Sequence, residues 1–423
     1  MNILYLTPAY PPFPGGGERY VAALAHNLAE RGHQLTVVTS AANFEVDFWQ
    51  GQQVKKTSGE KRAAVEIIRC PLRPFFGGRR GLLAWRKLMV LLSELPGEQT
   101  AVLQQMARAI PPIQDLEKSL TLIPQTIEIV HAFNISWEYT MLAGWQLAKE
   151  RHLPFVATPF THLGVKGADR VARNSTMDHQ MEMLRNADCI LTLTQIEKEG
   201  LLAWHLPREK VNVIWGGIEK AAAAADTMAP PVAMPTAPYV IFVGRASYDK
   251  GAIHAAQAVN RLRAKGIKIA LVLVGQSTNE FQTYLNKLSS VEKSGIHHYG
   301  ICADEEKHIL MSNAQMLLLP SRTDSFGLVL LEAWSHSLPV IGARAGGIPD
   351  VIDEGKNGLL VDFGDVEKLA EAVQHLLENK SVRVAFGEAG HQKIETTFTW
   401  QRVGDRVLQH YETLLSKFGN KQD

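Results

Sequence analysis

The stretch MLLLPSRTDSFGLVLLEAWSHSLPVIGARAGGIPDVI, residues 316–352, contains one complete strand–helix–strand unit. The apolar run 316–319 predicts a buried strand, and a polar loop separates it from an apolar helix that begins near Phe326 or Gly327. A second strand is expected at 340–343. Such units build a parallel α/β sheet, whose ligands bind beyond the carboxyl ends of its strands.

The loop before this helix carries a signal for anion binding. Asp324 or Ser325 is expected to cap the helix. The backbone N–H groups near Gly327, Leu328 and Val329 would then be available to an anionic ligand, because the first turn of a helix leaves its amides without helical partners.

The helix itself contains one acid among apolar residues, Glu332 in GLVLLEAW. A carboxylate in such surroundings is costly unless it is paired or hydrogen-bonded. Ribose hydroxyls are one suitable partner, and a buried salt bridge is the alternative. Farther on, Gly346 and Gly347 follow the second strand and offer a ligand another approach to the backbone, with Pro349 expected at the first position of a short helix.

The segment YVIFVGRASYDKGA, residues 239–252, has a similar organisation. Arg245 and Lys250 follow its apolar run on a loop framed by Gly244 and Gly251. Two cations at a strand end suit a pyrophosphate, because Arg grips oxygens bidentately and Lys supplies a compact charge. The alternative is that both are solvated, as most Lys and Arg side chains are.

The first forty residues predict another βαβ unit, with strands at 2–7 and 33–40 around a helix at 17–32. The helix is expected to bury one apolar face, made of Val21, Leu24, Ala25 and Leu28. Further strands are expected at 127–131, 155–158, 189–192, 269–274 and 358–361. Gly15, Gly16 and Gly17 immediately precede the first helix, where they either let a phosphate approach or simply make a tight turn into the helix.

Residues 221–238 are rich in Ala and Pro and indicate a linker. We therefore expect two doubly wound parallel-sheet domains of the α/β class, at 1–220 and 239–399, that face each other across a ligand cleft.

The composition and the chain's apolar segments bear on the class of protein and on its location. Lys plus Arg number 44 and Asp plus Glu 43, which does not favour a nucleic-acid-binding protein. The three cysteines are far apart, and neither a signal peptide nor a long apolar segment is evident, so the cytoplasm is the expected location.

Together these motifs resemble the retaining glycosyltransferases of family 4, also called glycosyl transferases group 1, which have the GT-B fold of two facing Rossmann-like domains. The resemblance spans nearly the whole chain. It rests on GGGERY, LAHNLAERGHQLTVVTS, VGRASYDKG and, most specifically, on SRTDSFGLVLLEAWSHSLPVIGARAGGIPDVI. It implies a sugar-nucleotide donor, usually a UDP-sugar and sometimes a GDP- or ADP-sugar.

The resemblance assigns roles to the charged residues of the second half. Arg245 and Lys250 match the pair that holds the donor pyrophosphate and stabilises the departing nucleotide. Glu332 matches the second acid of the family's E-x7-E motif, which binds the ribose hydroxyls. Asp324 stands in place of the first acid, which contacts the donor sugar, and is one methylene shorter than the usual Glu.

The remaining donor contacts implied by the resemblance are made largely by backbone. They are Phe326, Gly327, Leu328 and Val329, which meet the phosphates and sugar, and Gly16 and Gly17, which lie near the phosphates. Gly244 completes the set as the residue that lets the chain turn after its strand.

In the first half, His162 of PFVATPFTHLG matches a family histidine that hydrogen-bonds the donor sugar near its anomeric centre. His131 is a second candidate, with a structural core role as the alternative. Thr194 and Glu197 are expected near the linker side. Trp215 and Gly216 replace a Pro-Asn pair, so donor or hinge contacts at that point stay open.

The implied reaction retains the anomeric configuration without a protein nucleophile. No DxD-like acidic pair stands out, so neither a metal nor another cofactor is expected. The acceptor, a hydroxyl of a glycan, lipid or small molecule, is expected to bind mainly to the first domain, on which a final helix at about 400–418 packs back. The alternatives are a non-catalytic nucleotide-sugar-binding GT-B protein and a GT-B nucleotide-sugar epimerase.

Residues 73–92, RPFFGGRRGLLAWRKLMVLL, mix bulky apolar residues with Arg79, Arg80, Arg86 and Lys87. This composition is compatible with peripheral contact at the inner membrane face. The preferred alternative is an ordinary amphipathic helix that packs on the core or covers the acceptor groove.

Overall fold

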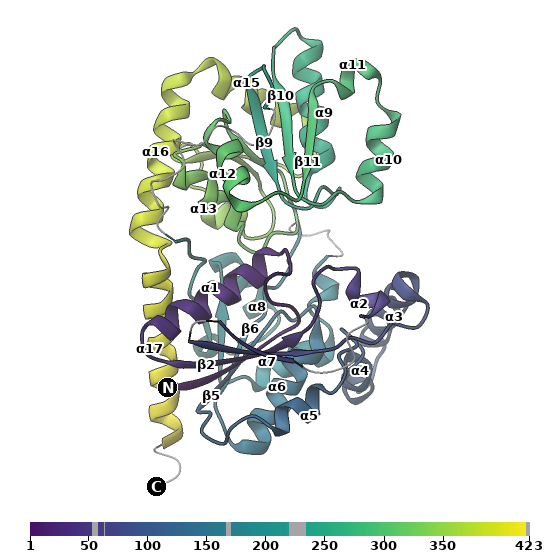
Figure 1. The fold of residues 1–423 in the computed structure, drawn as a ribbon, viewed down its shortest axis with the longest axis vertical. Coiled ribbons are helices and arrows are strands. Elements are labelled where there is room, and N and C mark those ends of the chain that lie inside the picture. The colour runs from purple at the N-terminus through teal and green to yellow at the C-terminus, as the bar shows by residue number, and fades with distance from the viewer. Residues whose placement is uncertain (53–57, 63, 166–170, 220–233, 420–423) are drawn as a thin grey trace. The chain divides into compact units, whose positions relative to one another are not determined.

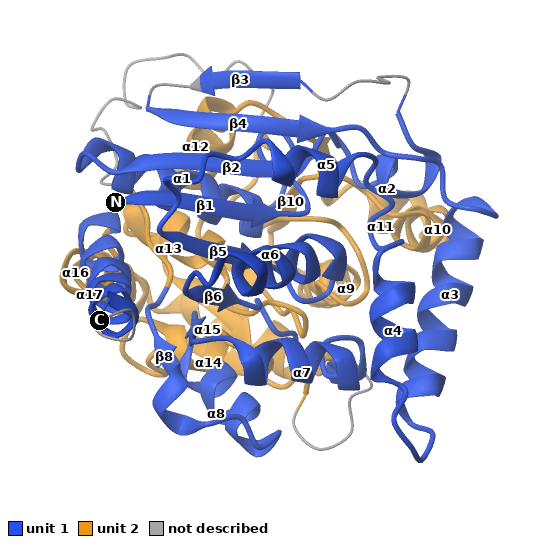
Figure 2. Ribbon diagram, turned by 90° about the horizontal axis from the view of Figure 1, so that it is seen from below, with its two compact units in different colours: residues 1–162, 170–215, 400–423 blue, residues 163–169, 216–399 orange. Residues whose placement is uncertain are grey.

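The computed structural model describes residues 1–52, 58–62, 64–165, 171–219 and 234–419. The chain divides into two compact units, which Figure 2 shows in blue and orange. Unit 1 comprises residues 1–162, 170–215 and 400–423, and unit 2 comprises 163–169 and 216–399. Most of the expected linker 221–238 lies outside the described residues.

Unit 1 is built on an eight-stranded sheet in the order β3-β4-β2-β1-β5-β6-β7-β8. All neighbouring strands are parallel except β3, which runs antiparallel to β4 at the edge. The strands are β1 (Asn2–Thr7), β2 (Gln34–Ser40), β3 (Ser58–Arg62), β4 (Val65–Cys70), β5 (Ile129–Phe133), β6 (Phe155–Thr158), β7 (Cys189–Thr192) and β8 (Val211–Val213).

Helices connect these strands and cover the sheet. They are α1 (Gly16–Glu30), α2 (Asp47–Gln50), α3 (Gly78–Ser93), α4 (Thr100–Ala107), α5 (Leu116–Thr121), α6 (Glu138–Arg151), α7 (Asp178–Asn186), α8 (Gln195–Ala203) and α17 (Trp400–Gly419), with 3-10 turns η1 (Ala172–Asn174) and η2 (Arg208–Lys210). The C-terminal helix α17 packs against α1 of this unit (Figure 1). Arg31 forms a 2.7 Å salt bridge to Asp405 there, and Tyr20 packs on Trp400.

Unit 2 has a six-stranded parallel sheet in the order β11-β10-β9-β12-β13-β14. The strands are β9 (Tyr239–Val243), β10 (Ala270–Val274), β11 (Ile296–Gly300), β12 (Leu317–Leu319), β13 (Val340–Ala343) and β14 (Gly358–Val361). The helices are α9 (Ala252–Ala264), α10 (Asn279–Lys287), α11 (Ser290–Lys293), α12 (Asp304–Ser312), α13 (Leu328–Ser335), α14 (Ile348–Val351), α15 (Val366–Glu378) and α16 (Lys380–Thr397). Their apolar faces bury a core around Val240, Phe242, Leu271 and Leu318.

The apolar runs expected as strands are strands, with ends that move by two residues at most. The run expected at 127–131 forms β5 at Ile129–Phe133, and the first helix covers Gly16–Glu30 rather than 17–32. Strands β3, β4, β8 and β11 were not anticipated. Because β9 and β12 are neighbours in the sheet, the loops that follow them emerge at the same edge of unit 2.

Candidate functional site

The loops after β9 and β12 bring two of the candidate charges into contact. Lys250 Nζ lies 2.9 Å from Asp324 Oδ1, and the two side chains are about one-fifth exposed, at 23% and 18%. Each therefore keeps one side open to solvent while a salt bridge fixes its position. Arg245, one residue after Gly244 at the end of β9, is exposed on the same loop.

A second set of contacts fastens these loops to each other. The Arg322 backbone N–H donates to the Asp249 carbonyl at 3.0 Å, and the Arg322 guanidinium binds the Asp249 carboxylate at 2.7 Å. Gly251 has φ +80°, and a Cβ there would clash with the Pro320 carbonyl. The loop that carries Lys250 and the loop that carries Asp324 are thus held as one structure.

Helix α13 begins differently from the expectation. Its N-cap residue is Gly327, at φ +86°, and no side chain caps it, so the expected cap by Asp324 or Ser325 is wrong. The loop is instead fixed by Gly347, whose N–H donates to the Asp324 carbonyl at 2.8 Å. Leu328 and Val329 form the first turn, where the helix dipole favours negative charge.

The glycine pair after β13 therefore has a packing role. A Cβ at Gly346, which has φ +56°, would clash with the Asp324 carbonyl oxygen. A ligand approach to the backbone of Gly346 and Gly347 stays a prediction, whereas their contact with the Asp324 loop is observed. Pro349 is the second residue of α14 and not the first.

Glu332 on α13 forms the salt bridge that was the alternative to ribose binding. Its Oε2 lies 2.9 Å from Lys307 Nζ, and Lys307 also reaches Asp304 at 2.9 Å. Lys307 is 7% exposed and Glu332 is 20% exposed, so the lysine is enclosed and the acid still reaches solvent. Lys307 was missed in the sequence, although it is spaced with Leu310 and Met311 on the buried face of α12.

Phe326 is a packing residue through its side chain. It is 2% exposed and meets Phe398 edge to face, with ring centroids 5.6 Å apart. A Cβ at Gly216 would clash with the Phe326 ring, which explains why glycine occupies position 216. Trp215 has φ +67°, a conformation that a bulky residue rarely adopts.

In unit 1 the glycine loop is partly helical. The N-cap of α1 is Gly15, so Gly16 and Gly17 are the first residues of the helix and do not precede it. A Cβ at Gly17 would lie 3.3 Å from the Phe160 ring, so this glycine also allows close packing. The glycines follow β1, at the carboxyl edge of the unit 1 sheet.

His131 is a core residue. It is fully buried, with one ring nitrogen 2.5 Å from the Tyr411 hydroxyl and the other 2.8 Å from Thr158 Oγ1. Burial lowers the pKa of His131 well below its ordinary value. The contacts favour the structural alternative for this histidine.

His162 lies in the loop after β6 and is partly exposed. The residue before it, Thr161, donates its N–H to the buried Glu197 carboxylate at 2.6 Å. Glu197 also accepts from the Leu193 N–H at 2.8 Å, and Thr194 caps α8 by accepting from the Glu197 N–H. Thr194 and Glu197 thus hold the loop that leads to His162.

Within unit 2, the loops and helix starts at the carboxyl ends of β9 and β12 hold Gly244, Arg245, Lys250, Asp324, Phe326, Gly327, Leu328 and Val329, with Glu332 farther along α13. Within unit 1, Gly16, Gly17 and His162 follow strands β1 and β6, which β5 separates. Over the described ranges, no group of three or more His, Cys, Asp and Glu side chains is arranged to hold a metal ion. No helix among the described residues is long and apolar enough to cross a membrane.

Two family models match the chain. The model described as "Glycosyl transferase 4-like domain" matches residues 15–217, and the model described as "Glycosyl transferases group 1" matches residues 227–393. The two matches together span nearly the whole chain.

Among curated relatives, a glycogen synthase of Mycobacterium tuberculosis is 25% identical, covering 100% of this chain and 96% of that protein. A D-inositol 3-phosphate glycosyltransferase of Corynebacterium jeikeium is 26% identical, covering 95% and 92%.

Solved structures support the same fold. A sucrose-phosphate synthase from Thermosynechococcus elongatus superimposes with a TM-score of 0.73 at 20% identity, covering 98% of this chain and 99% of that one. HepE of Anabaena, in complex with UDP and glucose, gives a TM-score of 0.69 at 16% identity, covering 98% and 100%. The chain therefore belongs to the glycosyl transferases group 1, family 4, and is a glycosyltransferase with the GT-B fold.

Proposed function

We propose that this glycosyltransferase transfers a sugar from a UDP-sugar, with retention at the anomeric carbon, to a hydroxyl of a glycan, lipid or small-molecule acceptor. The observation that carries the proposal is the Lys250–Asp324 pair beside the start of α13, which lacks a side-chain cap. A cation, an acid and helix amides at one sheet edge suit a sugar diphosphate. The HepE structures with UDP and with UDP-glucose support the choice of nucleotide.

The proposed mechanism is electrostatic. Departure of UDP builds negative charge on the β-phosphate, and Arg245, Lys250 and the amides of Leu328 and Val329 would stabilise that charge. Asp324 holds the Lys250 ammonium in place and would accept a hydrogen bond from a donor-sugar hydroxyl. Glu332 would receive the ribose hydroxyls while Lys307 keeps its carboxylate oriented.

In unit 1, His162 would hydrogen-bond the donor sugar near its anomeric carbon, and Gly16 and Gly17 would admit the phosphates to the start of α1. We propose that the reaction needs neither a metal nor a further cofactor. We also propose a cytoplasmic location, because the three cysteines, all within the described residues, form no disulfide.

The donor is tested by a thermal-shift screen with UDP-, GDP- and ADP-glucose, followed by donor hydrolysis and NMR of the product's anomeric configuration. A UDP-sugar that raises the melting temperature, and an α-product from an α-donor, are expected. Stabilisation by none of the three nucleotides, or an inverted product, would contradict the proposal.

A further inference from the structure

Helix α3 of unit 1 has apolar residues on two opposite faces. Leu82 and Met89 point into the core, at 8% and 0% exposure. On the other side, Leu83, Leu88 and Leu91 are 49%, 45% and 61% exposed. A surface helix ordinarily has one apolar stripe and one polar face, so packing against unit 1 does not explain the outer leucines.

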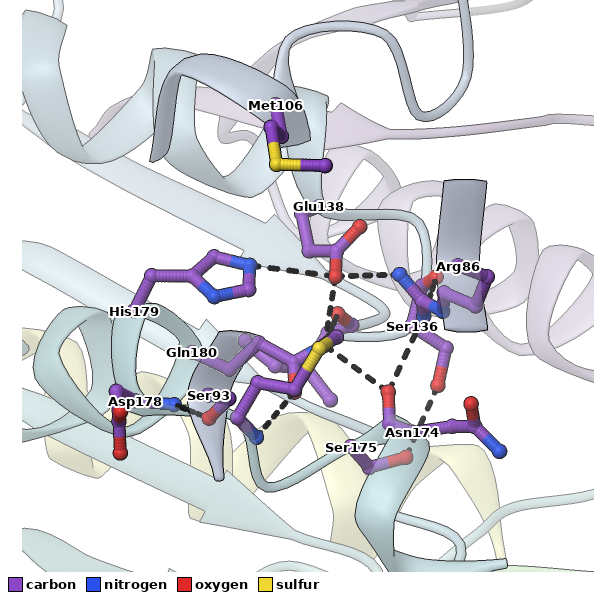
Figure 3. A network of polar contacts seen from close by, with 12 residues as sticks. Arg86, Ser93, Met106, Ser136, Glu138, Asn174, Ser175, Asp178, His179 and Gln180 are labelled. Carbon is purple, nitrogen blue, oxygen red and sulfur yellow. Dashed lines mark hydrogen bonds and ion pairs between the residues drawn. The ribbon is translucent and has the colours of Figure 1, made fainter. Parts of the chain in front are cut away.

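The inner face of α3 is fixed by a buried polar network (Figure 3). Arg86 lies 2.5 Å from the fully buried Glu138 carboxylate and donates to the Ser136 carbonyl at 2.6 Å. His179 and Gln180 of α7 contact the same carboxylate, at 3.3 Å and 2.8 Å. Burial would raise the pKa of Glu138, but the charge of Arg86 and the contact with His179 lower it, so Glu138 is ionised.

Arg86 is therefore an internal anchor and does not belong to a basic surface, as the sequence had grouped it. This anchor fixes which side of α3 faces outward. Helix α4 lies beside α3 at one side of unit 1 (Figure 2), and the outer face of α3 is left to solvent within that unit.

The outer face of α3 is cationic as well as apolar. Arg80, Leu83, Lys87 and Leu91 are all exposed and follow one another at helical spacing, so cations and leucines alternate along one stripe. Arg79 is exposed beside them, over the Trp49 ring. Phe76, in the turn before the helix, is 95% exposed, and no acid occurs between residues 73 and 93.

We propose that this stripe, with Phe76, is a docking surface for an anionic membrane. Leucine and phenylalanine side chains enter the headgroup boundary while Arg and Lys meet the lipid phosphates, as in helices that lie in a membrane interface. A second copy of the same stripe is a poorer partner, because two such stripes would bring like charges together. The inference is independent of the donor and of the acceptor.

The test is co-sedimentation of the full chain with vesicles of phosphatidylcholine alone and with about one-third phosphatidylglycerol. Binding to the anionic vesicles only, weakened by salt, is expected. Arg79→Gln, Arg80→Gln and Lys87→Gln together should weaken it roughly a hundredfold, about fivefold for each cation. Leu83→Ser with Leu91→Ser should weaken it roughly tenfold for each leucine.

Matched controls lie on unit 2. Lys265→Gln, Lys268→Gln and Lys287→Gln remove the same charge from exposed positions, and Val291→Ser removes an apolar side chain that is 75% exposed. These variants should bind as the parent does. The proposal is overturned if the parent fails to bind anionic vesicles, if the controls lose as much binding as the α3 variants, or if the leucine variants instead dissolve a dimer seen by sedimentation.

Discussion

Lys250 and Asp324 form a charge pair that neutralises itself in the absence of donor. When a pyrophosphate binds beside this pair, the Lys250 ammonium can interact with a phosphate oxygen as well as with the Asp324 carboxylate. The contribution of Lys250 is therefore expected to be larger in the transition state, where phosphate charge peaks, than in the ground state.

Lys250→Ala is accordingly expected to lower kcat by roughly a hundredfold to a thousandfold, the usual cost of removing one group that stabilises developing charge. The fold should survive, because the Lys250 side chain is part-exposed. Steady-state kinetics and circular dichroism measure the two effects. Lys293→Ala, at an exposed position of α11, is the control, and parental turnover in Lys250→Ala would remove the lysine from the mechanism.

The Lys307–Glu332 pair makes a different prediction. Lys307→Met keeps the length of an enclosed side chain and removes the cation 2.9 Å from Glu332. The KM for the donor should rise about tenfold with little change in kcat, because the acid proposed to bind the ribose loses its orientation but the reacting atoms keep theirs.

Lys368→Met is the matched control, since Lys368 pairs with Glu371 at 2.7 Å on the exposed surface of α15. Surface pairs of this kind are worth little. Equal KM values for Lys307→Met and the parent would show that Glu332 does not depend on its partner.

Glu197 is a buried acid whose titration should be visible in stability. Burial raises the pKa of its carboxyl to about 7. The hydrogen bonds that the carboxylate accepts from the Leu193 and Thr161 N–H groups act in the opposite direction and lower the pKa. The folded protein then binds a proton more tightly than the unfolded chain, so stability is greatest below the unfolded pKa of about 4.3 and falls as pH rises toward 7. The loss amounts to about 4 kcal/mol.

Glu197→Gln should remove this pH dependence, since the amide does not titrate. Urea unfolding at several pH values between 5 and 8 measures it. Glu199→Gln, on the exposed side of the same helix, should keep the parental slope. An unchanged slope in Glu197→Gln would assign the titration to another group.

At the scale of elements, the loop after β9 and the loop after β12 pack closely because Gly251 has no side chain. Gly251→Ala adds a Cβ both to a positive φ and against the Pro320 carbonyl. Gly266→Ala is a matched control, because Gly266 has φ +86° with no atom within 4 Å of the added Cβ. The control should lose only the strain of its φ, about 1 kcal/mol.

Gly251→Ala should lose at least about 2 kcal/mol more than the control and should also lower turnover, because the loops that carry Lys250 and Asp324 must separate. Thermal unfolding and steady-state kinetics are the measurements. Equal losses in the two variants would show that the loops tolerate the movement.

The sequence predicts these elements well where the signal is local. Strands β6, β7, β9, β13 and β14 have the expected bounds, because buried parallel strands are short apolar runs between polar or glycine-containing segments. The side-chain cap expected for α13 is wrong because contacts with Gly346 and Gly347, which lie beyond β13, decide the path of its loop.

The candidate site shows the same division. The types and spacing of Lys250, Asp324 and Glu332 are visible in the sequence, but the side chains that they contact are brought to them by tertiary structure. Lys307 lies on α12 and Glu332 on α13, so the local pattern of neither helix predicts the salt bridge between them. The composition of 73–92 groups Arg86 with the other cations of α3. Its burial depends on Glu138, which lies on α6 and is not visible in the local pattern of α3.

At the scale of the whole molecule, the chain begins and ends in unit 1. Helix α17 buries Trp400, Val403, Val407, Tyr411 and Leu414. The Tyr411 hydroxyl also forms hydrogen bonds with the His131 ring and with the Tyr5 hydroxyl. The last twenty described residues are therefore part of the core of unit 1, although unit 2 precedes them in the sequence.

Val407→Asp places a charge on the buried face of α17 and should cost about 3 to 5 kcal/mol, because no partner compensates its desolvation. Gln409→Asp, on the exposed face of the same helix, adds the same charge at little cost. Amide exchange followed by mass spectrometry should show faster exchange in β1 and β7 of unit 1 for Val407→Asp, while β9 and β12 of unit 2 exchange as in the parent. If both units are loosened equally, they unfold as one cooperative body and α17 stabilises the whole chain rather than unit 1 alone.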